Sequence, residues 1–238
     1  EVAVAQEDEE PPTKFSKWME EKWKISVTDV VTVVATMLGV VLAVGLFLYL
    51  PNLFTGLIYD AAPVIGNQGS IWYNLIEGGF RLVIFILYIL FTLLFPSLRE
   101  TYRYHGAEHK CINCIEHGLE LNVANVRASS KEHKRCGTSF IMIVMVISIL
   151  FFMVIRTDTI WLRIVSRIVL IPVIAGVSYE VLKLAGNSDN PVVNLLSKPG
   201  LMLQGLTTKE PDEKMAEVAI CAVEAVFDWK AYEEANFN

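Results

Sequence analysis

Four long apolar stretches constrain the fold of this chain more than any other feature. They cover residues 28–50, 77–98, 137–155 and 160–185. Each is about 20 residues long, the length at which a helix crosses the roughly 30 Å hydrocarbon core of a bilayer. Composition agrees, since 53% of the residues are hydrophobic and only 19% are charged. We therefore expect an all-α, polytopic membrane protein with about four transmembrane helices.

Two of these stretches contain charged side chains. The second begins with Glu77 and Arg81, and the fourth contains Arg163, Arg167 and Glu180. Charges inside a bilayer are costly unless they are paired, but long side chains near a helix end can extend to the interface. We expect the two arginines of the fourth stretch to extend to the interface in this way.

The distribution of basic residues predicts the orientation in the membrane. Residues 51–77 contain no Lys or Arg, whereas residues 99–136 contain seven. By the positive-inside rule, the loop 99–136 should face the cytoplasm. With four crossings, both termini then lie on the cytoplasmic side as well.

The chain divides into three predicted parts. Residues 1–27 are an acidic N-terminal segment, and because the chain begins with Glu1 we expect its natural N-terminus to lie further upstream. Residues 28–186 are the transmembrane domain, including the cytoplasmic loop 99–136. Residues 187–238 contain an interfacial segment and a cytoplasmic, amphipathic C-terminal helix. The net charge of −6 and the lack of a broad basic surface argue against a nucleic-acid partner.

The C-terminal helix is expected to start near Thr208 or Pro211. Apolar residues recur on one face at helical spacing, namely Met215, Val218, Ala219, Ala222, Val223 and Val226. Such a stripe usually packs into a core, which is the interpretation that we favour. The alternative is a docking face for another protein.

The sequence HGAEH, residues 105–109, is the strongest chemical motif. On a helix, His105, Glu108 and His109 lie on one side. In the pattern His-x-x-Glu-His, two imidazoles one turn apart bind zinc and the glutamate serves as general base. The motif therefore predicts a metal site with Glu108 as a catalytic residue. The alternative is a polar loop in which the histidines have no such role.

A third protein ligand is needed, and the sequence offers more than one. Glu180 lies near the cytoplasmic end of the fourth stretch, and His133 and Cys136 precede the third, so all three should lie at the depth of the motif. Cys111, Cys114, His133 and Cys136 also form a competing C-x2-C-x18-H-x2-C pattern typical of structural zinc sites. One ion cannot use every group, so the two patterns stay as alternatives.

Several strings resemble the YqhQ-type family of bacterial membrane proteins, a domain of unknown function, family 1385. They include YHGAEHK, VANVRASS, HKRCGTSF and PGLMLQGLTTKEP. The resemblance implies a protein of the bacterial inner membrane, and the family's label of metal-dependent enzyme implies a metal site. The positions that match the family pattern are His105, Glu108, His109, His133, Cys136 and Glu180. Cys111 is not part of that pattern, and the family's starting Gly-Gly-Gln-Ala-Val segment is absent here.

Two functions from different classes follow from these observations. The first is a metal-dependent hydrolase, with zinc as the expected ion, acting at the cytoplasmic membrane face. The second is a non-catalytic scaffold or assembly factor of a larger membrane complex, with a structural metal or polar site. In either case the lipid bilayer is a partner, and protein partners would bind the cytoplasmic loop or the C-terminal helix. An open coordination position beside a cleft would favour the enzyme.

Overall fold

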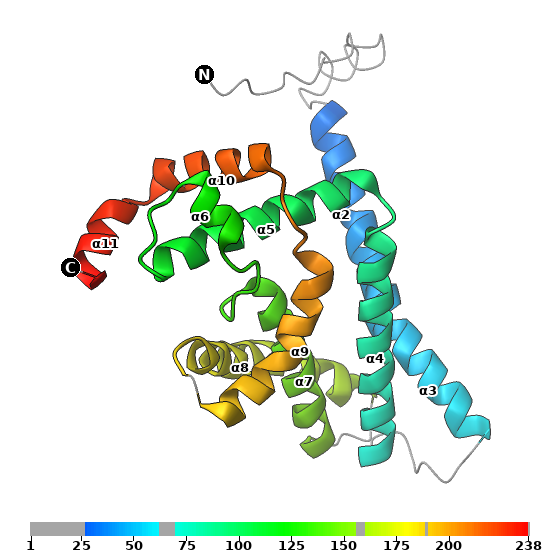
Figure 1. Cartoon of the computed structure of the whole chain (residues 1–238). Coiled ribbons are helices and arrows are strands. Elements are labelled where there is room, and N and C mark those ends of the chain that lie inside the picture. Colours follow the sequence, from blue (N-terminus) through cyan, green and yellow to red (C-terminus); the bar gives the residue numbers. More distant parts are fainter. Residues whose placement is uncertain (1–26, 62–69, 156–159, 189, 238) are drawn as a thin grey trace. The chain divides into compact units, whose positions relative to one another are not determined.

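The computed structural model describes residues 27–61, 70–155, 160–188 and 190–237, which form helices without any β-strand among them (Figure 1). In chain order these are α2 (Val27–Val44), the π-helix η1 (Gly45–Tyr49), α3 (Leu50–Ala61), α4 (Ile71–Thr92), α5 (Pro96–Glu116), α6 (Val123–Ala128), α7 (Gly137–Val154), α8 (Ile160–Gly186), α9 (Pro191–Thr207), α10 (Glu213–Val226) and α11 (Trp229–Phe237).

Four helical segments of the described chain are long and apolar enough to cross a membrane. They are Thr28–Ala61, Ile71–Thr92, Gly137–Val154 and Val165–Gly186. Each matches one of the apolar stretches of the sequence, although the boundaries differ. The predicted all-α fold is confirmed for the described residues, with four candidate membrane-spanning helices.

Contacts divide the chain into two units, Glu1–Asn52 and Leu53–Asn238. In the first unit, apolar side chains of α2 such as Val34 and Met37 are 59% and 65% exposed, as suits a helix surrounded by lipid. The hydroxyls of Thr32 and Thr36 donate to the carbonyls of Thr28 and Thr32, at 2.8 and 2.7 Å. These bonds satisfy the hydroxyl groups within the helix itself.

In the second unit, α4, α7, α8 and α9 pack against one another. Glycines permit close approach: a Cβ at Gly78 of α4 would collide with Ile149 of α7, and one at Gly200 of α9 would lie 2.8 Å from the Ser139 hydroxyl of α7. Small residues at such crossings are typical of helices that associate in membranes.

A buried ion pair joins α4 to α8. The carboxylate of Glu77, 2% exposed, accepts hydrogen bonds from Arg167 at 2.9 and 3.1 Å and from Arg81 at 2.8 Å. The expectation that Arg167 extends to the interface is therefore wrong, because the guanidinium has a buried carboxylate as partner. The side chain of Arg163 lies outside the described part of the structure.

Helix α4 does not run on into the segment that contains HGAEH. It ends at Thr92, four residues before Pro96, where α5 begins as a separate helix (Figure 1). Proline suits the first turn of a helix because it has no N–H to donate there, but it breaks a helix interior. The predicted span 77–98 is thus displaced from the observed Ile71–Thr92, and most of the predicted loop 99–136 is helical.

Helix α5 packs against α6 and α10 around a small apolar core. The buried members of this core are Ala107, Cys111, Cys114, Ile115, Leu121, Val126, Ala216, Ala219 and Trp229. Helix α10 starts after Asp212, whose carboxylate accepts a hydrogen bond from the Met215 N–H at 3.0 Å, rather than at Thr208 or Pro211. The expected interfacial segment is helix α9, which packs on α7 and α8.

Candidate metal centre

Helix α5 brings two histidines together. His105 and His109 are one turn apart, and the centroids of their rings are 4.4 Å apart. His109 is 3% exposed, because the connection between α6 and α7 covers it, while His105 is half-buried. The helical spacing predicted from HGAEH is thus the spacing observed.

Cys136 joins these histidines from the start of α7. It is the N-cap residue of that helix, and its Sγ lies 3.4 Å from Nε2 of His105. One ligand atom from each of His105, His109 and Cys136 lies within 4.8 Å of the others. Among the residues that the structure describes, this is the group of histidine, cysteine and acidic side chains with the spacing to hold a metal ion.

Both imidazoles are oriented by backbone carbonyls. Nδ1 of His105 donates to the Thr207 carbonyl at 3.0 Å, and Nδ1 of His109 donates to the Lys131 carbonyl at 2.7 Å. A carbonyl only accepts, so each Nδ1 must carry a proton, and in a neutral ring Nε2 then has the lone pair that a metal would need. This is how histidine ligands are usually oriented around a metal.

The electrostatics of the group favour a thiolate. Burial raises the pKa of the Cys136 thiol, but hydrogen bonds with His105, His109 and Thr138 outweigh burial and lower this pKa to about 5. The hydrogen bond with Cys136 in turn raises the pKa of His105. The position of Cys136 at a helix N-terminus also favours negative charge. At neutral pH the sulfur is therefore ionised, which is the form that binds metals.

His133 is not part of the group. Its Nε2 lies 3.0 Å from the Glu116 carboxylate, and its Nδ1 accepts from the Arg135 N–H at 3.4 Å. Both ring nitrogens are thus engaged. The His133 ring still lies near the centre, with its centroid 6.0 Å from that of His109.

Glu180 also lies outside the group. Its side chain is exposed on α8, and it is absent from the set of mutually close donors in the described chain. The structure thus brings together three of the residues predicted from sequence as ligands, and it leaves Glu180 and His133 out.

The competing cysteine pattern does not form. Cys111 and Cys114 are fully buried in the apolar core of α5, α6 and α10. Burial raises the pKa of Cys111 to about 12 and also raises that of Cys114. They are neutral core residues, and the zinc pattern with His133 and Cys136 is an accident of spacing.

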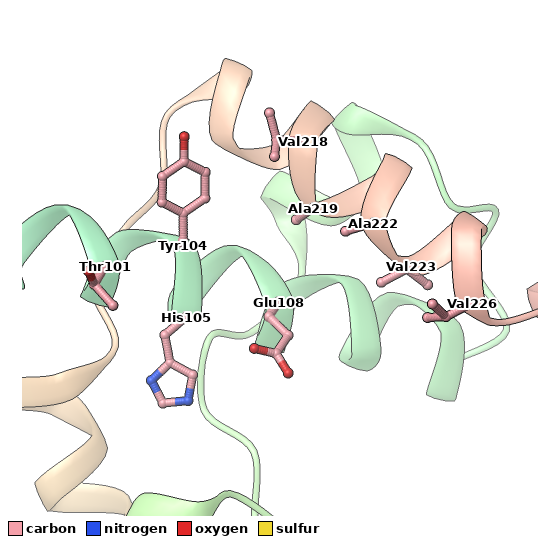
Figure 2. Close-up of a pocket in the computed structure, with 9 residues that line it drawn as sticks. All are labelled: Thr101, Tyr104, His105, Glu108, Val218, Ala219, Ala222, Val223 and Val226. Atoms are coloured by element: carbon pink, nitrogen blue, oxygen red, sulfur yellow. The ribbon is translucent and has the colours of Figure 1, made fainter. Parts of the chain in front are cut away.

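A groove runs between α5 and α10 beside the centre (Figure 2). Its volume is about 490 Å³, within the range of roughly 300–1,000 Å³ typical of ligand sites. Helix α5 contributes Thr101, Tyr104, His105 and Glu108, and α10 contributes Val218, Ala219, Ala222, Val223 and Val226. Figure 2 shows His105 and Glu108 leaving α5 on the side away from α10, so the apolar wall and the polar edge are opposite each other.

Comparison with known proteins agrees with the family resemblance seen in the sequence. Residues 3–229 match the family described as "Protein of unknown function (DUF1385)". The chain belongs to this family. It is similar to the protein described as "Uncharacterized protein YqhQ" of Bacillus subtilis (strain 168), with 43% identity over 162 residues. That match covers 68% of this chain and 51% of the relative, so the chain spans about half the length of the relative. No solved structure matches the chain.

Sequence reasoning missed Gln204 of α9, which is fully buried. Its side-chain oxygen accepts the His133 N–H at 3.0 Å, and its nitrogen donates to the His133 carbonyl at 2.7 Å and to the Ser139 hydroxyl at 2.6 Å. Gln204 thus fixes the connection that leads to Cys136. The signal in the sequence was an amide inside the apolar string LMLQGL, since a buried amide needs partners.

Lys110 is a second residue that the motif analysis missed. Its buried ammonium donates to the carbonyls of Arg127 and Ser129, both at 2.8 Å, and pairs with the Glu210 carboxylate at 2.8 Å. Lys110 thus links α5 to the C-terminal end of α6 and to the segment before α10. Satisfying a buried charge with three acceptors offsets its desolvation.

Proposed function

We propose that this protein is a metal-dependent hydrolase of the membrane that holds one divalent ion on His105, His109 and Cys136. Two imidazole nitrogens and a thiolate are donors that zinc prefers. The 3.4 Å between Nε2 of His105 and Sγ of Cys136 suits two ligands of one zinc, since bond lengths of about 2.0–2.3 Å in a tetrahedron separate neighbouring ligand atoms by roughly 3.3–3.8 Å.

The observation that carries the proposal is the number of donors. Three residues of the described chain have ligand atoms within 4.8 Å of one another. Structural zinc sites are usually closed by four protein ligands, whereas catalytic sites use three and leave one position open. The groove that His105 helps to line is the proposed route by which a substrate would reach such a position.

Glu108 is the proposed general base. Its carboxylate is exposed at the edge of the groove, and within the described chain it has no hydrogen-bond or ion-pair partner. It is therefore free to accept a proton from water. A bound divalent metal would act as a Lewis acid on a carbonyl oxygen and acidify water. His105 and His109 would orient the ion, because the carbonyls of Thr207 and Lys131 hold their rings.

The proposal includes the side of the membrane. Seven basic residues lie between 99 and 136, and none lies between 51 and 77. By the positive-inside rule, this bias supports a position of the centre at the cytoplasmic face of a bacterial inner membrane, with both termini of the chain in the cytoplasm.

Metal analysis of the full-length protein in lipid nanodiscs tests the proposal. We expect about one zinc ion per chain, as three well-placed donors imply, and its loss in His109→Ala and in Cys136→Ala. His117→Ala is the matched control, because His117 lies on an exposed turn at the end of the same helix, outside the group. Unchanged zinc content in both ligand variants would overturn the proposal.

The variant Glu108→Gln tests whether Glu108 acts as a general base or as a metal ligand. The variant should keep its zinc and lose about 10²- to 10⁴-fold in hydrolysis, the usual effect of removing a general base. Retained zinc without any hydrolysis of acyl esters or amides by the wild type would instead favour the structural metal of a scaffold or assembly factor.

A further inference from the structure

The apolar wall of the groove is exposed on a helix that is not one of the candidate membrane spans. Val226 of α10 is 86% exposed and Val218 is 50% exposed, while Met215 and Ala219 of the same stripe are buried. The sequence predicted that this stripe packs into the core, but only part of it is buried there. Exposed contiguous apolar surface outside the spans marks an interaction site.

The bilayer surface itself is a poor partner for this wall. Helices that lie flat on a membrane are rich in Lys and Arg, whereas α10 contains Glu213, Glu217 and Glu224 and a single lysine, Lys214. The wall is also one side of an open groove whose other side is α5. A ligand in this groove would contact both helices.

An extended peptide is a poor partner for a different reason. Its backbone N–H and C=O groups need hydrogen-bond partners when they are buried. Both walls are helices whose backbone groups are engaged internally, and the α10 wall consists only of Val and Ala side chains. An acyl chain has no such requirement and is bound by apolar area alone.

We propose that this groove holds the acyl chain of the substrate, a neutral long-chain acyl ester or amide. The inference rests on the proposed hydrolase function. With the chain against Ala222 and Val223, the carbonyl lies at the opposite edge, near His105 and Glu108. The lining contains no Lys or Arg, and Glu108 adds negative charge, so a neutral head group fits better than a phosphate.

The reaction that this geometry serves is hydrolysis of the acyl bond. A water oxygen bonds to the carbonyl carbon, and the bond from that carbon to the ester oxygen or amide nitrogen breaks. Glu108 takes the proton from water and returns it to the leaving group. The products are a long-chain carboxylic acid and an alcohol or amine, and no further reactant is needed.

Photocrosslinking tests the binding of the chain without relying on activity. The probe is the N-methyl amide of a 16-carbon fatty acid with a diazirine in its chain, added to the full-length protein in nanodiscs. We expect crosslinks to residues 218–226. These should fall about tenfold or more in Val223→Glu, because a carboxylate in the groove is costly to desolvate. Ala225→Glu is the control, since Ala225 is exposed on α10 but does not line the groove.

A second variant is needed in case Val223→Glu does not fold. Ala222→Phe keeps the groove apolar but reduces its volume, so it should lose crosslinks to the 16-carbon probe and retain them to an 8-carbon probe. Equal crosslinking in wild type, Val223→Glu and Ala222→Phe would overturn the inference. Displacement of the probe by an apolar helical peptide, and not by the unlabelled amide, would assign the groove to a partner protein and also overturn it.

Zinc content measured in the same variants separates this inference from the proposed function. Val223→Glu and Ala222→Phe should retain zinc, because neither residue supplies a ligand atom to the group. Crosslinks to α10 in a protein that binds no zinc would mean that the hydrolase proposal fails while the acyl-chain site stands. Zinc bound without these crosslinks would mean that the acyl-chain site fails while the metal centre stands.

Discussion

Cys136 concentrates the chemistry of the centre in a single side chain. Its sulfur contacts an imidazole, caps α7 and accepts a hydrogen bond from the Thr138 N–H at 3.4 Å. The lowering of its pKa to about 5 means that protons compete for the sulfur only in acid. Metal affinity should therefore decline as the pH falls, first because His105, whose pKa is raised, takes up a proton, and further as the sulfur is protonated near about 5.

Thiolate absorbance of the metal-free protein tests this directly. The Cys136 signal should appear as the pH rises through about 5, and His105→Ala should move that midpoint upward because a hydrogen bond that favours the thiolate is lost. Cys136→Ser identifies the signal, and Cys111, whose pKa is raised to about 12, stays silent in this window. A midpoint near the ordinary value of 9.0 would contradict the assignment.

Gly106, next to His105, is a backbone contact point. A Cβ there would collide with the backbone carbonyl of Lys209, whose N–H donates to the Tyr102 carbonyl at 2.9 Å. Gly106→Ala should therefore lower stability by about 1–3 kcal/mol, as overpacking does, although alanine normally favours a helix. Gly205→Ala, with no atom within 4 Å of the new Cβ, is the control. Equal melting temperatures for the two variants would contradict this packing.

At the scale of the elements, periodicity predicted which helices exist and missed where they end. The apolar run continues to Leu98, so nothing in hydropathy marks the end of α4 at Thr92. The relevant signal was Pro96, the first residue of α5, because proline favours the first turn of a helix. The pairing of Glu77 with Arg167 was beyond sequence analysis, because it depends on which faces of α4 and α8 point inward.

That ion pair predicts a non-additive pair of substitutions. Glu77→Gln removes the buried carboxylate that pairs with Arg167, and should destabilise the protein by about 3 kcal/mol. Adding Arg167→Met removes the guanidinium that has lost this carboxylate and should recover part of the loss. Thermal unfolding in nanodiscs measures both variants. Additive losses would show that the two side chains act independently.

At the scale of the whole molecule, the sequence predicted the all-helical fold with its long apolar helices and named three residues that the structure brings together, but it also offered candidate ligands that the fold does not bring together. His105 and His109 follow from helical spacing alone. Cys136 was one of several candidates for the third ligand. The sequence predicts which residues should lie at a similar depth in the membrane, but not which helix faces point toward one another. Glu180 is exposed on α8 and outside the group of three, and His133 is adjacent to the centre but engaged by Glu116.

Orientation in the membrane is a whole-molecule prediction. Asn67 lies outside the described residues, in a segment without basic residues, and Asn67→Cys should react with an impermeant thiol reagent added to intact cells. Native Cys221, exposed on α10, should react only after the cells are opened. Cys111 and Cys114 are too buried to serve as reporters. Reaction of Cys221 in intact cells, with Asn67→Cys protected, would reverse the proposed orientation.

The hydrogen bond from His105 to the Thr207 carbonyl spans 102 residues of sequence. A ribosome that has made the chain only as far as α8 has already produced both histidines and the cysteine, yet neither this carbonyl nor Gln204 exists. Biosynthesis therefore delivers the donors long before the groups that orient them. We therefore expect stable metal binding only after α9 has been synthesised and has packed on α7. A protein with bound metal would then be one whose helices are fully assembled.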